Sequence, residues 1–274
     1  MRNILVPVDF SPASRNAAEY AGQLAKGWNA RITLFHAYML PTPVTEVPYV
    51  MVTADELQKE NEEYIREEAQ HLHGQFGLEV EWVVRIGIAS DEIKELIREK
   101  GIDLIVMGMK GAGGLDKIIG STTTNVNRKV AVPVLVVPHD ATYRPIHQAA
   151  YATDLTEVAQ VAIFEPFLEL VKNSSAKVHI LHVAKSDAAG AGELVSRKGQ
   201  ENLFEGLDHE FVTVTDSSIT QGINNYLKNN QIDLLTMVAH KHSFFERLFS
   251  KSYTAAMSYE THIPLLVLHE KGNG

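Results

Sequence analysis

The sequence predicts an α/β protein made of two tandem, doubly wound domains, each containing a five-stranded parallel sheet. Three observations predict this fold. The chain contains the same ordered set of segments twice. Continuous apolar segments such as LIVMG are typical of strands that are buried on both faces of a parallel sheet. Amphipathic helical segments alternate with these strands, as a doubly wound fold requires.

The repeat consists of four blocks that occur in the same order in both parts of the chain. The paired blocks are residues 3–11 with 148–156, 30–38 with 176–184, 92–108 with 222–238, and 131–139 with 262–270. A single non-repeating domain is the alternative, but four matches in one order favour a duplication. We therefore predict one domain over residues 1–144 and a second over residues 145–274.

The elements of the first copy can be placed in order. A short apolar strand leads to Asp9 and is followed by a helix from about Pro12 to Lys26. Ser11 suits the N-cap of this helix, Pro12 its first position and Gly27 its end. A second strand follows at residues 30–38. Beyond a proline-broken segment, a charged helix begins at about Ala54.

Composition excludes several classes of function. The chain has 274 residues, a formal net charge of -9 and no cysteine, so disulfides, Fe–S clusters and thiolate zinc sites are excluded. The negative charge makes DNA or RNA a poor partner. No segment approaches the ~20 continuous apolar residues of a membrane span. The first residues do not resemble a signal peptide. We expect a cytoplasmic protein that binds neither nucleic acid nor membranes.

The strongest local motif is MGMKGAGGLDKIIGSTTTNV, residues 107–126. It follows a predicted strand directly, at the edge where open α/β sheets bind ligands. Gly120 and Ser121 open a helix whose free N–H groups favour an anion such as a phosphate, and Lys110 adds positive charge. The motif is neither a P-loop nor a dinucleotide-binding G-x-G-x-x-G. The alternative is a tight turn in which Ser121 only caps the helix.

Asp9 is the second candidate feature, because it stands at the end of the first strand. In a doubly wound sheet, the ends of the first and fourth strands lie side by side. A carboxylate at this place can accept hydrogen bonds from a ribose or from an adenine amine. The alternative, equally compatible with its position, is that Asp9 caps the helix that follows.

These residues together resemble the universal stress protein (UspA) family. The resemblance rests on PVDFS, LFHAY, the spacing of Gly108 and Gly111, the pair Gly120-Ser121, and VPVLVVP. It covers nearly the whole chain, as two family domains in tandem with the adenine nucleotide alpha hydrolase-like fold. ATP-binding members contain G-x2-G-x9-G-[ST]. Here eight residues separate Gly111 from Gly120, one fewer than in that pattern.

The resemblance implies an ATP-binding stress-response or signalling switch. It is also compatible with a Mg²⁺ or Mn²⁺ ion bound to the phosphates. The nucleotide-binding residues that it implies are Pro7, Asp9, Ala37, Met107, Gly108, Lys110, Gly111, Gly120, Ser121 and Thr122. No catalytic residues and no metal-binding side chains are expected. The alternatives are a nucleotide-independent protein-interaction module and a slow ATPase.

The resemblance also implies how the two copies assemble. The strands around Val134 and Leu265 each end a copy, and in the family two such strands pair across a dimer. Within one chain, the same pairing gives an intrachain pseudo-dimer, and further homodimerisation stays open. Apolar sheet edges tend to be covered in this way.

The second copy departs from the motif at each glycine. Val238, Lys241 and Ser250 stand where the first copy has Gly108, Gly111 and Gly120. A Cβ at these places crowds a bound phosphate and disfavours a positive φ. We therefore expect one nucleotide per chain, in the first copy, with a structural or partner-binding role for the second.

Overall fold

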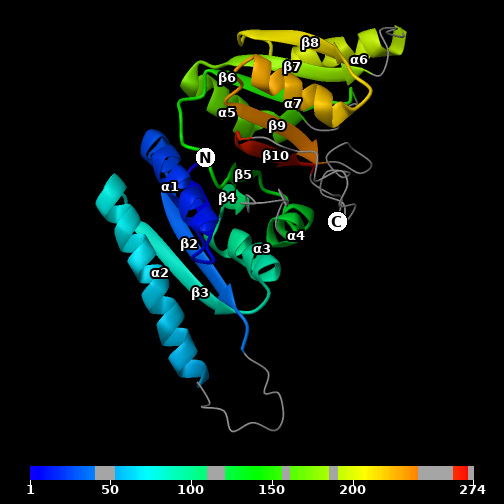
Figure 1. Ribbon diagram of the computed structural model, residues 1–274. Helices are drawn as coiled ribbons and strands as arrows, with labels where there is room; N and C mark the ends of the chain where they lie inside the picture. Colours follow the sequence, from blue (N-terminus) through cyan, green and yellow to red (C-terminus); the bar gives the residue numbers. More distant parts are fainter. Residues whose placement is uncertain (41–52, 110–120, 156–160, 185–190, 240–261, 271–274) are drawn as a thin grey trace.

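The computed structural model describes residues 1–40, 53–109, 121–155, 161–184, 191–239 and 262–270. The strands form one sheet of ten, in the order β3-β2-β1-β4-β5-β10-β9-β6-β7-β8 (Figure 1). Each half contributes five parallel strands, and helices cover both faces of the sheet. The predicted fold class is therefore confirmed.

The first half alternates strands and helices as expected. Its elements are β1 (Asn3–Pro7), α1 (Pro12–Trp28), β2 (Arg31–Tyr38), α2 (Ala54–Phe76), β3 (Val80–Ile86), α3 (Ala89–Lys100), β4 (Leu104–Met109), α4 (Ser121–Lys129) and β5 (Val134–Pro138).

The second half repeats this order in the residues that the structure describes. Its elements are β6 (Gln148–Thr153), the 3-10 helix η1 (Val161–Phe164), α5 (Glu165–Ser174), β7 (Lys177–Ala184), α6 (Ala191–Asn202), β8 (His209–Thr215), α7 (Ile219–Asn229), β9 (Leu234–Ala239) and β10 (Leu265–His269).

Helix α1 begins as predicted and ends later than predicted. The Ser11 side chain accepts a hydrogen bond from the backbone of Ser14, and a proline occupies the first turn. The expected end at Gly27 is wrong, because the helix continues through Gly27 to Trp28. Asn29 instead takes the left-handed conformation, with φ of 52°, and caps the last turn. Helix α2 begins at Ala54, as expected, behind a capping box made by Thr53 and Glu56.

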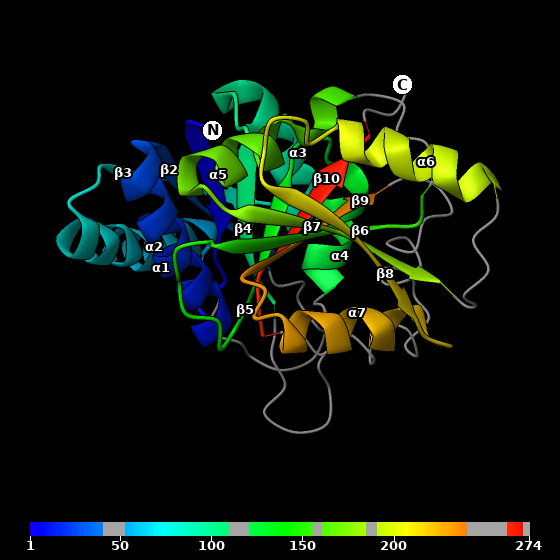
Figure 2. The same ribbon diagram turned by 90° about the horizontal axis from the view of Figure 1, so that it is seen from above.

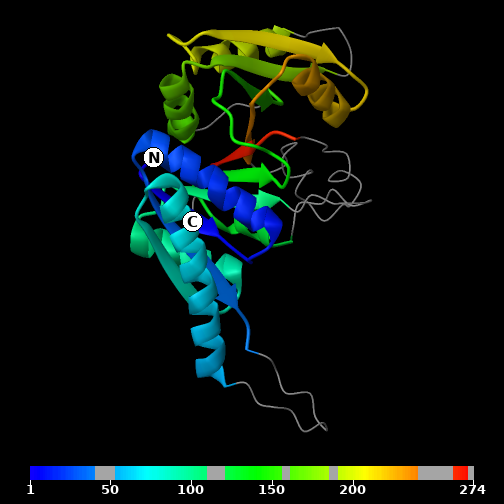
Figure 3. The same ribbon diagram turned by 60° about the vertical axis from the view of Figure 1, so that its left-hand side comes forward.

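The apolar core forms two layers, one on each face of the sheet. One layer packs α1, α2 and α5 against the strands, and the other packs α3, α4 and α7. In Figure 2, α5 and α6 lie on one side of the strands of the second half and α7 on the other. Figure 3 brings α1 and α2 in front of the strands of the first half. Both layers contain residues of both halves, so the halves share one core.

Two antiparallel strands at the centre of the sheet join the halves. Strand β10 pairs with β5, with Leu265 opposite Val136 and Val267 opposite Val134. The intrachain pseudo-dimer is therefore present.

The first strand of each half begins with the same kind of contact, made by an aspartate. Asp103 accepts hydrogen bonds from the backbone N–H groups of Arg2 and Asn3, and Asp233 does the same for His147 and Gln148, where β6 begins. Within the described residues, no helix combines the length and apolarity that a membrane span needs.

Candidate functional site

A cavity of about 270 Å³ lies in the first half, at the carboxyl ends of its parallel strands. The first and fourth strands, β1 and β4, pair directly there. Six of the residues that the sequence singled out line this cavity, namely Pro7, Asp9, Ala37, Met107, Gly108 and Thr122. They come from β1, β2, β4, α4 and the β1–α1 turn, which shows why residues far apart in the sequence meet at this edge.

The β1–α1 turn fixes Asp9 at the mouth of the cavity. Asp9 Oδ1 accepts hydrogen bonds from the backbone N–H and the hydroxyl of Ser11. Ser14 Oγ in turn accepts from the Asp9 backbone N–H at 3.3 Å and donates to the Ser11 carbonyl at 3.0 Å. Ser11, and not Asp9, provides the side-chain cap of α1. Asp9 thus orders the turn while its exposed carboxylate lies beside the cavity.

An aromatic contact supports the same turn from the side of β2. Phe10 takes a left-handed conformation with φ of 61°, and its ring centroid lies 4.5 Å from that of His36. The Nδ1 atom of His36 lies 2.7 Å from the Val8 carbonyl oxygen, so the imidazole holds the end of β1. His36 is therefore a structural residue whose neighbour, Ala37, lines the cavity.

The structure gives a reason for the glycine at position 108 that the sequence did not predict. It lies within β4 and not in a positive-φ turn. A Cβ at Gly108 would lie 2.5 Å from the carbonyl oxygen of Ala13, far inside van der Waals contact. The glycine therefore lets the first turn of α1 pack directly on β4, which places Ser14 and the turn around Asp9 at the cavity.

Of the remaining predicted residues, three stand in the sequence between β4 and α4, and the fourth begins α4. Lys110, Gly111 and Gly120 fall outside the described residues. Ser121 is the first residue of α4, and the Thr123 hydroxyl donates a hydrogen bond to the Gly108 carbonyl at 3.3 Å. The N-terminus of α4 thus opens beside the cavity, as the sequence argument expected.

Sequence reasoning missed several residues of the lining. They are Val8, Ser11, Ala13, Ser14, Phe35, Ala89 and Thr123. Each lies at the end of a predicted strand or in the first turn of the helix that follows. Extending the search to every such junction would have found them, because all of these junctions meet at one edge of the sheet.

The second half keeps the turn after its first strand and changes what surrounds it. Leu155 repeats the left-handed conformation of Phe10, with φ of 62°, and His182 Nδ1 lies 3.0 Å from the Thr153 carbonyl oxygen. Val238, however, is buried at the place of Gly108, with 5% of its surface exposed. Among the described residues, the first α-helix after β6 begins at Glu165, whereas α1 begins five residues after the end of β1.

Comparison with known proteins gives a consistent result. The model of the Universal stress protein family matches residues 1–138 and again residues 146–269. A universal stress protein of Synechocystis is 26% identical over 97% of this chain and 99% of its own length. One of Methanocaldococcus jannaschii is 30% identical over 50% of this chain and 81% of its own length.

A crystal structure shows the same fold over nearly the whole chain. It is that of a universal stress protein from Archaeoglobus fulgidus, which superposes with a TM-score of 0.76 at 21% identity. The superposition covers 97% of this chain and 98% of the other. The tandem arrangement of two such units is therefore found in another solved protein.

Proposed function

Because this chain belongs to the universal stress protein family, we propose that its first half binds one adenine nucleotide, ATP, and that occupancy acts as a stress-response or signalling switch. The observation that carries the proposal is the gathering of Pro7, Asp9, Ala37, Met107, Gly108 and Thr122 around one cavity. We propose residues 1–144 as the nucleotide-binding domain and residues 145–274 as the second domain.

The lining suits the base and ribose of a nucleotide. Phe35 and Met107 are buried apolar side chains that offer an apolar wall to the base, and the backbone of Ala37 offers hydrogen-bonding groups at its edge. The exposed Asp9 carboxylate is an acceptor for ribose hydroxyls. In this proposal the phosphates bind at the N-terminus of α4, at Ser121 and Thr122, together with Lys110, Gly111 and Gly120.

A metal ion in this proposal depends on the nucleotide. Among the described residues, no group of three or more His, Asp or Glu side chains is arranged to hold a metal. Mg²⁺ or Mn²⁺ would therefore be bound mainly through phosphate oxygens, where it neutralises their charge. Among the described lining residues, Asp9 is the only candidate for a general base, and its Oδ1 already accepts two hydrogen bonds from Ser11, so we propose binding and not turnover as the activity.

A matched pair of variants tests the site. Isothermal titration calorimetry of the full chain with ATP is expected to give about one site per chain. Asp9→Ala should weaken binding about tenfold or more, because a hydrogen bond to a charged group contributes about 1.5–3 kcal/mol. Asp154→Ala, the same change in the second half, should leave the affinity unchanged. Gly111→Val should abolish binding by filling the phosphate loop.

The other outcomes identify the alternatives. If ATP, ADP and AMP all fail to bind at millimolar concentration, the protein is a nucleotide-independent interaction module. Steady phosphate release that disappears in Asp9→Ala and Ser121→Ala would instead identify a slow ATPase. Equal ATP affinity of wild type and Asp9→Ala would show that the nucleotide lies elsewhere.

A further inference from the structure

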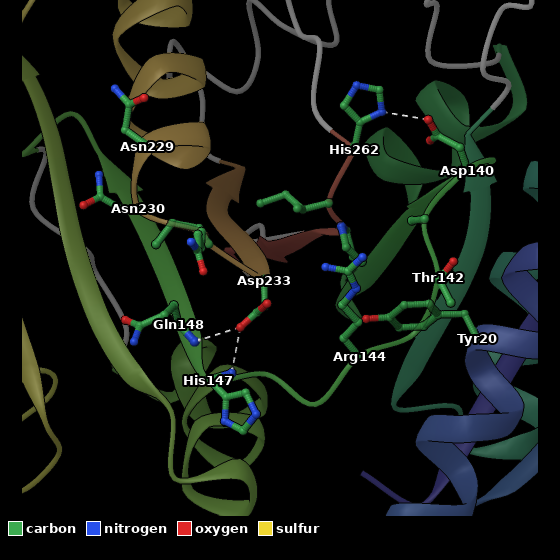
Figure 4. A pocket seen from close by; sticks show the side chains of 15 residues that line it. Tyr20, Asp140, Thr142, Arg144, His147, Gln148, Asn229, Asn230, Asp233 and His262 are labelled. Carbon is green, nitrogen blue, oxygen red and sulfur yellow. Dashed lines mark hydrogen bonds and ion pairs between the residues drawn. The ribbon is translucent and has the colours of Figure 1, made fainter.

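A second cavity, of about 780 Å³, lies between the two halves (Figure 4). Its walls come from Tyr20 on α1, from the connector 140–148, from residues 229–233 between the end of α7 and β9, and from residues 262–264 before β10. Its described lining shares no residue with the cavity of the first half. The connector that closes one wall exists because the two halves are one chain.

The two carboxylates of this cavity already have partners within the protein. Asp140 Oδ2 lies 2.7 Å from Nδ1 of His262. Asp233 Oδ2 accepts hydrogen bonds from the backbone N–H groups of His147 and Gln148, at 2.8 and 3.0 Å (Figure 4). Asp103 makes the equivalent contacts in the first half, with the backbone N–H groups of Arg2 and Asn3. Asp233 is thus explained by its role in starting β6.

The guanidinium of Arg144 differs from these two carboxylates in its contacts. It makes no hydrogen bond or ion pair with any residue that the structure describes, and Arg144 is exposed on the connector. In Figure 4, Arg144 and Tyr20 lie on one side of the space between the halves, and Asp233 lies on the other side, turned towards His147 and Gln148. A planar guanidinium with five donors fits a carboxylate or a phosphate through two parallel hydrogen bonds.

Neutral hydrogen-bonding groups complete the lining. Asn229, the last residue of α7, and Gln231, two residues later, line the cavity on the side of the second half. Tyr20 is buried, and burial together with Tyr143 and Asp233 raises the pKa of its hydroxyl, which therefore remains protonated at neutral pH. Such a wall can bind the uncharged polar part of a small molecule whose acidic group meets Arg144.

We propose that this cavity binds a small molecule with a single acidic group, a carboxylate or a phosphate, and that Arg144 is its main binding residue. The nearby Asp140 and Asp233 carboxylates disfavour a polyanion such as a nucleoside triphosphate through like-charge repulsion. The ligand class therefore differs from that of the first-half cavity. The inference does not depend on nucleotide binding there.

The test uses the full chain and two anions as separate probes. Acetate and inorganic phosphate are titrated at constant ionic strength, with chloride as the reference salt, while the amide NMR signals of His147, Asn230 and Asp233 are followed. One or both probes should give saturable shifts in the millimolar range. Saturation by acetate alone identifies a carboxylate ligand, and saturation by phosphate alone identifies a phosphate ligand.

Three variants assign the binding residue. Arg144→Gln should weaken the affinity for the active probe about tenfold or more, which corresponds to about 1.4 kcal/mol. Asn229→Asp should weaken it severalfold, because it adds a negative charge to the lining. Arg66→Gln, on the exposed face of α2, is the matched control and should change nothing. No saturable shift with either probe, unchanged affinity in Arg144→Gln, or tighter binding in Asn229→Asp would overturn the proposal.

Discussion

The two halves of this chain keep the same scaffold and differ in what they build on it. Asp103 and Asp233 start β1 and β6 in the same way, and His36 and His182 hold the ends of those strands. At the carboxyl ends of the strands the halves differ, because Gly108 admits the first turn of α1 whereas Val238 fills the equivalent place.

This difference distinguishes residues that are needed for the fold from residues that shape the cavity of the first half. The strand starts and the histidine contacts satisfy backbone groups that any copy of the fold must satisfy. The glycine in β4 serves the close approach of a helix to a strand, and the cavity depends on that approach. A duplicated unit can therefore change residues of this second kind and keep its fold.

The largest expected effect is a loss of stability at low pH. It comes from one buried histidine of the second half, which the first half replaces by another residue. His269 on β10 stands where the first half has Pro138. Burial lowers the pKa of His269 to about 4, although backbone groups of Asn127 and Val132 partly offset this. The unfolded chain takes up a proton below about pH 6.5, and the folded protein does so only near pH 4. The free energy of unfolding should therefore fall by about 3 kcal/mol between these values.

Urea denaturation at a series of pH values checks this effect. His269→Gln should remove most of the pH dependence between about 6.5 and 4, even if it lowers stability at neutral pH. His139→Gln, an exposed histidine at the end of the first half, is the control and should keep the dependence. Burial also lowers the pKa of His179, which adds a smaller contribution of the same sign. An unchanged slope in His269→Gln would contradict the assignment.

The second prediction converts the first half into the second at one position. Gly108→Val should destabilise the protein by about 2 kcal/mol, because its Cβ meets the Ala13 backbone and the helix must shift. The same shift displaces Ser14 and the Asp9 turn, so ATP binding should be lost. Denaturation and calorimetry measure the two effects.

A matched change in the second half controls for general destabilisation. Val238→Ala leaves a small space in a buried position and should lower stability without changing ATP affinity. Wild-type stability in Gly108→Val would show that α1 does not need the glycine.

The third prediction distinguishes two aspartates with the same role. Asp103 uses both oxygens, one for Arg2 and one for Asn3, whereas Asp233 uses a single oxygen for both of its backbone partners. An asparagine keeps one carbonyl oxygen. Asp103→Asn should therefore cost about 1 kcal/mol, and Asp233→Asn clearly less. Equal losses in denaturation experiments would contradict this reading of the contacts.

The smallest expected effect is that of the exposed ion pair between the halves. Asp140 and His262 lie 2.7 Å apart, but 41% and 68% of their side-chain surfaces are exposed. Asp140→Asn should change stability by about 0.5 kcal/mol or less, and 1 M salt should remove the difference. A larger, salt-independent loss would indicate that the connector is held mainly by this pair.

The sequence was sufficient for the architecture because the repeat and the buried strands are local patterns. It also identified six residues that line one cavity, since strand ends can be located from sequence. It was wrong about the end of α1, where Asn29 and not Gly27 takes the left-handed conformation. It assigned Gly108 to ligand binding and missed its packing role, because the contact with Ala13 joins residues far apart in the chain.

The cavity between the halves could not be found in the same way. Tyr20, Arg144 and Asp233 belong to three separate segments, and none stands in a recognisable motif. They meet only because β5 and β10 pair and so bring the connector against α1. Lys110, Gly111 and Gly120 lie outside the described residues, and their assignment stays a prediction.

The position of β10 has a consequence for synthesis on the ribosome. This strand comes last in the chain but lies at the centre of the sheet, and its Val267 pairs with Val134 of β5. At about 5–20 residues per second, the first half emerges many seconds before its partner strand is made. During that interval the apolar edge of β5 lacks its native neighbour, and such edges attract other strands. Translation that stops before β10 should therefore yield a self-associating fragment.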